Sequence, residues 1–300
     1  MRAAPLRGVV LLASAVLLFA CMNATTKYLT ASYAVPLVVA VRYIVHLLLM
    51  VIILGPRQRQ RLYRTRRTGL VVVRALCLVV ASLFLGLGLQ RMPVAESTAI
   101  IFLAPMLVVL VARPVLGETI GALGWIAALL GFAGVLLIVR PGSGLDPLAV
   151  AYLLVTVTAT VAYLLLSRVL APTESPVAML FYVAVAGSIC FGASLPWSIG
   201  GPVPSGWDVL FFISMGITGG LGHFLFTAAF RYAAASILAP INYLQLVWAG
   251  LLGWIVFGHV PNAPTALGMV VVIISGVIIA VKSARSTKAQ DPAPIQSQGV

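Results

Sequence analysis

Apolar residues run along this chain in long blocks that are interrupted by short polar stretches. Ten of these blocks come close to the roughly 20 residues that a helix needs to cross a hydrocarbon core of about 30 Å. The pattern therefore predicts an all-α integral membrane protein with ten transmembrane helices. Their expected positions are residues 8–26, 34–54, 69–89, 94–112, 120–139, 147–167, 177–195, 209–230, 235–257 and 264–281.

The stretch 89–139 has a second version at residues 229–281. Both copies contain an Arg at a helix junction, a Pro inside an apolar block and a Gly before a polar residue: Arg91, Pro105 and Gly117-Glu118 in the first, Arg231, Pro240 and Gly258-His259 in the second. We therefore predict a duplicated chain, with one repeat at residues 1–144, a second at 145–281, and a disordered tail at 282–300. Because each repeat has five helices, an odd number, the two repeats should enter the membrane with opposite polarity. Such inverted repeats are typical of secondary transporters.

Composition supports a membrane protein, because 62% of the residues are hydrophobic, only 8% are charged, and the mean hydropathy is +1.12. A cleaved signal peptide or a lipoprotein signal at the first block is the less favoured alternative, since its removal would leave the two repeats unequal. The three cysteines stand singly in apolar blocks, so we expect neither a disulfide framework nor a zinc site.

The net charge of +13 comes mostly from short segments between the apolar blocks. Lys and Arg gather in alternate loops, which lie on one side of the membrane, and Arg74 is assigned to the membrane interface on that side. Only Lys27, Arg91 and Arg140 fall on the other side. The positive-inside rule then places both termini in the cytoplasm of a bacterial cell, with the chain in the inner membrane. This bias explains the charge better than nucleic-acid binding does.

The chain resembles the drug/metabolite transporter superfamily in its EamA-type, ten-helix branch. The resemblance covers nearly the whole chain and is carried by Arg42, the run from Pro105 to Gly117-Glu118, residues 131–135, and the block 236–249 followed by Phe257-Gly258. It implies a two-repeat fold and a transport activity, but not a substrate, because members move amino acids, vitamins, opine-like metallophores and drugs. His259 departs from the family, whose repeats often carry an acidic residue after that Gly.

Arg42 and His46 are the first candidates for substrate binding. They lie one turn apart on one face of the second predicted helix. An Arg deep in a membrane helix is costly, so Arg42 should face a polar interior and hold an anionic group of the substrate, such as a carboxylate. The alternative is a structural Arg that ties helix ends together through backbone carbonyls.

Two other helices carry polar stripes. Tyr163 belongs to a stripe in the sixth helix, and Asn242, Tyr243, Gln245 and Trp248 lie close together in the ninth. Polar groups on one face of a membrane helix turn inward, where they either bond neighbouring helices or line a cavity. We predict that these five residues contribute to a substrate site, with interhelical bonding or core packing as the alternatives.

Titratable residues give hypotheses on coupling and gating. The six acidic residues fall at helix starts, in loops or in the tail, and Glu96 there should stabilise its helix through the helix dipole. Proton coupling, if present, would then depend on His46 or His223, whose side-chain type titrates near physiological pH. Glu118 and Arg113 would form an ionic gate, or Glu118 would serve its helix dipole alone.

The sequence lacks a Walker A loop, clustered catalytic residues and cofactor motifs, so we expect neither an ATP-driven pump nor an enzyme, and no cofactor. The predicted function is secondary transport of a small molecule across the bilayer by a monomer or homodimer. The first hypothesis is export of an amino-acid-like or carboxylated metabolite, opine-type metallophores included. The alternative is uptake of a planar vitamin-type or nucleobase-type metabolite.

Overall fold

The computed structural model describes residues 5–116, 122–140, 144–229, 231–233, 238 and 241–290. Every regular element in these residues is helical, which confirms the predicted all-α class. The helices are α1 (Pro5–Thr30), α2 (Val35–Leu49), α3 (Gly55–Gln58), α4 (Thr68–Arg91), α5 (Val94–Ile101), α6 (Leu103–Leu116), α7 (Ala122–Val139), α8 (Pro147–Leu170), α9 (Pro176–Ser198), α10 (Gly206–Ala229), α12 (Leu244–Phe257) and α13 (Ala263–Gln290). Short π and 3-10 turns, Met50–Leu54 and Arg59–Leu62, flank α3.

Each predicted apolar block coincides with helix in the described residues. Six helical spans are long and apolar enough to cross a membrane, namely those of α1, α2 with its extension, α4, α8, α9 and α10. Shorter apolar helices cover the remaining blocks, at Val94–Val108, Trp125–Val139, Leu244–Phe257 and Ala263–Ile278. The exact number of crossings stays a prediction.

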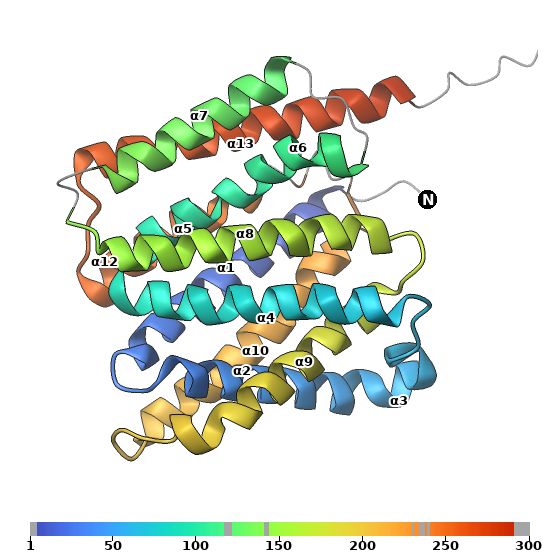
Figure 1. The fold of residues 1–300 in the computed structure, drawn as a ribbon, viewed down its shortest axis with the longest axis vertical. Coiled ribbons are helices and arrows are strands. Elements are labelled where there is room, and N and C mark those ends of the chain that lie inside the picture. The colour runs from blue at the N-terminus through green and yellow to red at the C-terminus, as the bar shows by residue number, and fades with distance from the viewer. Residues whose placement is uncertain are drawn as a thin grey trace, which may run out of the picture.

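The helices pack in pairs that join the two predicted repeats (Figure 1). The α7–α13 pair lies at the top of that view and the α2–α9 pair near the bottom, while α4 packs on α8 and α1 on α10. When helices are matched by their order in each repeat, α1 corresponds to α8 and α4 corresponds to α10. The α1–α10 pair is therefore equivalent to the α8–α4 pair. Two inverted copies predict this pairing, although the inverted relation itself stays a prediction. The start of α1 and the end of α13 lie at the same end of the bundle.

The block predicted as one helix at residues 94–112 is divided into α5 and α6 at Phe102. Pro105 explains the break, because proline has no N–H to donate to the carbonyl of Ile101 four positions earlier. A turn at Tyr243 likewise precedes α12 in the second repeat. The rings of Phe102 and Tyr243 lie 4.9 Å apart between their centroids, so the two irregular positions pack on each other.

The last helix differs from our expectation, because α13 continues to Gln290, whereas we expected a disordered tail from residue 282. Residues 280–290 are mostly Ala, Lys, Arg, Ser and Gln, with no Gly or Pro, and several of these are strong helix formers. The predicted tail is therefore helical in its first part, and its remainder lies outside the described residues.

Candidate functional site

Arg42 and His46 both point from α2 into the bundle, and the two residues are only 8% and 6% exposed. Glycines on α10 permit this burial. A Cβ at position 220 would lie 3.0 Å from Cδ2 of His46, so Gly220 leaves room for the imidazole. Two residues that share a face by sequence spacing thus share an interior environment between α2 and α10.

His223 on α10 meets His46 across this contact. The two imidazole rings are nearly parallel, with 6.2 Å between centroids and 7° between planes. Phe19 of α1 covers His223 from another side at a centroid distance of 4.8 Å. The positive charges of Arg42 and Arg74 act on His223, as does His46, so we treat these four groups as one neighbourhood.

Arg74 of α4 is the residue of this neighbourhood that our sequence analysis treated only as an interfacial charge. It is only 5% exposed, because it packs between helices. Its Nε donates to Ser167 Oγ at 2.7 Å, its Nη2 to the Tyr163 hydroxyl at 2.7 Å, and its Nη1 to the Met179 carbonyl at 3.3 Å. The guanidinium also lies 4.2 Å from the centroid of the Tyr163 ring. These contacts join α4 to α8 and α9.

Aromatic rings border the same neighbourhood. The guanidinium of Arg42 lies 4.8 Å from the centroid of the Tyr43 ring. Tyr43 shares a 2.7 Å hydrogen bond with Ser82 Oγ and stacks on Phe191 at 5.8 Å. We call Arg42, His46, Arg74 and His223 the cationic cluster, with Tyr43 and Tyr163 as its aromatic border.

No described carboxylate neutralises the cationic cluster. Glu174 accepts hydrogen bonds from the backbone amides of Arg66 and Arg67, and Asp146 pairs with Arg91 at 3.0 Å. Asp208 accepts from Tyr33 and Ser205, and Glu96 bonds His259. Glu118 and Asp291 lie outside the described residues. Buried cations without a counter-ion are costly, so within the described part of the chain this arrangement favours binding of a ligand with anionic or carbonyl groups.

The predicted residues of the ninth helix block lie in other surroundings. Tyr243 packs into a hydrophobic core against Phe102, and its phenol contacts Gly276 directly. Trp248 packs beside Leu12 and Val16, and its buried Nε1 has no hydrogen-bond partner among the described residues. Asn242 and Gln245 are partly buried and make no side-chain hydrogen bond within the described part of the chain. Their role in substrate binding stays a prediction.

The predicted gate cannot be described. Glu118 lies outside the described residues, and nothing is shown of the Arg113 side chain. Sequence reasoning also missed Tyr43, Ser82 and Ser167. The sequence did contain a signal that Arg74 is buried, because Arg74 is a lone Arg among apolar residues, as Arg42 is.

The sequence profile of the EamA-like transporter family matches residues 6–140 and again residues 147–281. The chain belongs to the EamA-like transporter family. It is 26% identical over 279 residues to the riboflavin transporter of Vibrio cholerae, covering 90% of this chain and 92% of that protein. It is also 26% identical over 211 residues to the S-adenosylmethionine uptake transporter of Rickettsia prowazekii, covering 70% and 71%.

A solved structure described as a crystal structure of a protein has the same fold, with a TM-score of 0.66 at 18% identity and coverage of 93% of this chain and 98% of that one. The family match and the apolar helices together make this chain a multi-pass membrane transporter of a small metabolite. The predicted family is therefore confirmed.

Proposed function

We propose that this protein takes up a flat heterocyclic metabolite that carries carbonyl or carboxylate groups. The observation that carries this proposal is the cationic cluster, in which Arg42 and Arg74 lie near two stacked imidazoles and beside tyrosine rings. Guanidinium groups bind carbonyl and carboxylate oxygens, and aromatic and imidazole rings stack on flat ligands.

The names of the relatives favour uptake over the export that we placed first from the sequence. One relative is named as an uptake transporter for S-adenosylmethionine and another as a transporter for riboflavin. Both compounds contain a planar nitrogen heterocycle. We further propose that the substrate passes through chemically unchanged, so that the protein is not an enzyme.

Uptake into proteoliposomes tests this proposal, with riboflavin and S-adenosylmethionine as the radiolabelled probes. We expect saturable uptake of at least one probe, and a loss of about tenfold to a hundredfold in Arg42→Gln, which is the effect of removing a charge-assisted hydrogen bond. Arg91→Gln is the matched control, because Arg91 is about half exposed and pairs with Asp146. Uptake of neither probe, or equal uptake by Arg42→Gln and the unaltered chain, would contradict the proposal.

A second candidate function is export of an amino-acid-like or carboxylated metabolite. The lack of a described counter-ion at the cationic cluster also suits a carboxylate. Efflux from proteoliposomes preloaded with a mixture of labelled amino acids separates the two candidates. Efflux that requires Arg42, in a protein that takes up neither heterocycle, would favour export.

A further inference from the structure

A carboxylate is buried at the end of the bundle where α1, α4 and α12 finish. Glu96 is the third residue of α5 and is only 3% exposed. Its Oε1 lies 2.8 Å from Nε2 of His259, which follows α12 and is 163 positions away in the sequence. We expected Glu96 to stabilise the start of its own helix, and it does lie in the first turn of α5; its side chain also joins the two predicted repeats.

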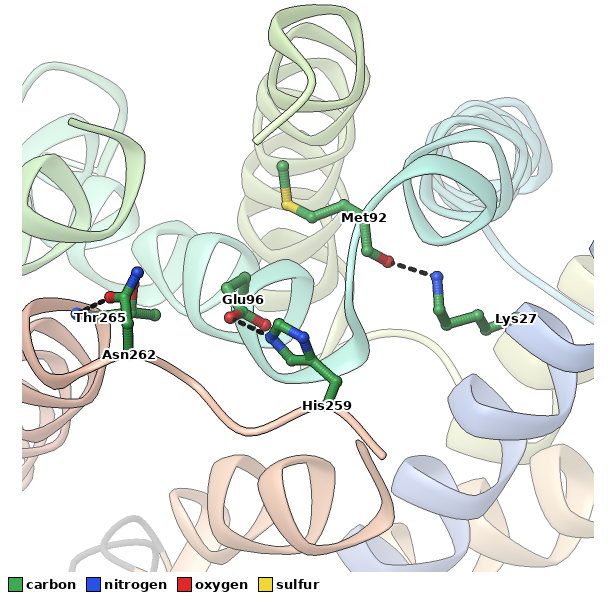
Figure 2. A network of polar contacts seen from close by, with 6 residues as sticks. All are labelled: Lys27, Met92, Glu96, His259, Asn262 and Thr265. Carbon is green, nitrogen blue, oxygen red and sulfur yellow. Dashed lines mark hydrogen bonds and ion pairs between the residues drawn. The ribbon is translucent and has the colours of Figure 1, made fainter. Parts of the chain in front are cut away.

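The segment after α12 holds the imidazole in place (Figure 2). Gly258 has a φ of 66°, which reverses the chain, and the amide of His259 then donates to the carbonyl of Gly253 at 3.1 Å. Asn262 accepts from the amide of Thr265 at 3.1 Å and so fixes the start of α13. His259 is thereby presented to α5 from a segment that is anchored at both of its ends.

Lys27 supplies a positive charge beside this pair. Its Nζ donates to the carbonyls of Leu89 and Met92, each at 2.9 Å, and it interacts electrostatically with Glu96. Arg91 also lies at this end but is paired with Asp146. Lys27 and His259 are thus the charged or titratable groups that face Glu96 from the described residues, one from α1 and one from the segment before α13.

The second oxygen of Glu96 distinguishes it from a structural carboxylate. Oε2 is buried and has no hydrogen-bond partner among the described residues. Glu174 is also buried, but its two oxygens accept from the backbone amides of Arg66 and Arg67. Buried polar atoms are normally satisfied, so an unpaired oxygen in an apolar bundle needs a reason. A site that must accept and release a proton provides one.

We propose that Glu96 and His259 form the proton-binding site that couples this transporter to a pH gradient. The inference rests on the transport function proposed above. The His259 side chain is 37% exposed whereas that of Glu96 is 4% exposed, so the imidazole is the more accessible partner of the pair. His259 takes a proton from the solution at Nδ1 and gives the proton on Nε2 to Oε1 of Glu96, which leaves a neutral imidazole protonated at Nδ1 and a carboxylic acid.

Protonation of Glu96 removes the negative charge that faces Lys27 and His259. The contact between the repeats then loses its charge-assisted hydrogen bond, and the ammonium of Lys27 is left without a nearby counter-charge. The two repeats should therefore separate at this end when Glu96 is protonated and close when it is ionised. This hypothesis competes with our sequence-based prediction that His46 or His223 carries the proton.

Two measurements that need no substrate test the proposal in the full-length chain reconstituted in liposomes. Infrared difference spectra recorded between pH 8 and pH 5 report protonation of a buried carboxyl group. Spin-label distances between Tyr28→Cys and Val260→Cys report opening, since both residues are exposed and adjoin Lys27 and His259. The label positions require prior replacement of Cys21, Cys77 and Cys190 by Ala.

We expect a carboxylic-acid band and a longer label distance to appear together on acidification. Glu96→Gln should abolish the band and keep the longer distance at every pH. Glu174→Gln, the matched buried control, should change neither result. His259→Gln should leave the band but slow its appearance after a pH jump by about tenfold or more, since a relay group is lost. The His259→Gln variant also tests the proposal if Glu96→Gln does not fold.

A band that persists in Glu96→Gln would overturn the proposal, as would a label distance in the unaltered chain that ignores pH. An unchanged proton-transfer rate in His259→Gln would overturn the relay role of that residue. Because no substrate enters these measurements, such outcomes leave the uptake proposal standing. Failure of the proteoliposome uptake test would in turn leave these results intact.

Discussion

The cationic cluster and the Glu96–His259 pair both bury charge inside an apolar bundle, but they satisfy it differently. The cluster gathers two guanidiniums and two imidazoles without a described carboxylate nearby. At the other site a carboxylate contacts an imidazole at 2.8 Å and faces an ammonium. The first site carries excess positive charge, whereas the second is nearly balanced.

This difference indicates that the two sites have different functions. Excess buried charge is tolerated where a ligand will neutralise it, and polar residues in membrane helices are often functional for that reason. A balanced pair that spans two predicted repeats instead holds them together, and it releases them when one proton is added. Even within the cluster there is a contrast, since Arg74 is held by three hydrogen bonds, whereas the guanidinium of Arg42 lies against the Tyr43 ring and makes no hydrogen bond within the described residues.

The contrast between the two arginines gives the largest expected effect on stability. Arg74→Ala removes the donor of three hydrogen bonds, to Ser167, Tyr163 and the Met179 carbonyl, and at about 1.5 kcal/mol for each bond from a charged group it should destabilise the protein by roughly 4 to 5 kcal/mol. Arg42→Ala should cost about 1 kcal/mol or less, because it removes a ring contact and leaves no acceptor of the described residues unpaired. Thermal unfolding in detergent, followed by tryptophan fluorescence, measures both. Equal losses in the two variants would remove the distinction between a fixed and a free guanidinium.

A smaller effect is expected when the imidazole stack is displaced. Gly220→Ala places a Cβ 3.0 Å from Cδ2 of His46, so the ring must shift by a few tenths of an ångström. Transport of a probe should fall about threefold to tenfold, since overpacking of this kind costs on the order of 1 kcal/mol. Gly250→Ala in α12 is the control, because nothing lies within 4 Å of a Cβ there. If both variants transport alike, the position of the stack is unimportant.

The smallest effect is expected at the exposed pair of Asp146 and Arg91. Hydrogen bonds from the Leu148 amide and from Arg91 hold the pKa of Asp146 below its ordinary value of 3.8. A carboxylate with a lowered pKa stabilises the fold above that ordinary value and loses the contribution as pH falls through the folded-state pKa. Asp146→Asn should therefore unfold slightly more easily at pH 7 and equally easily in strong acid. A difference that stays constant with pH would show that ionisation of Asp146 contributes nothing.

The positions of the helices were readable from the sequence. Long apolar blocks must leave water and must satisfy their backbone groups internally, which in lipid requires helices. The shared face of Arg42 and His46 was also readable, because a spacing of four is one helical turn. The family resemblance was also correct. It rested on short runs of residues in both repeats, which can be recognised without knowing how the helices pack.

The partners of the buried charges were decided only by the tertiary structure. Arg74 looks like an interfacial charge in the sequence, and its partners come from α8 and α9. Glu96 looks like a helix-dipole residue, yet its partner His259 is 163 positions away. Helical periodicity shows which way a side chain points on its own helix. Which residue it meets depends on how the helices pack against each other, and that arrangement is set by the side chains of the whole bundle together.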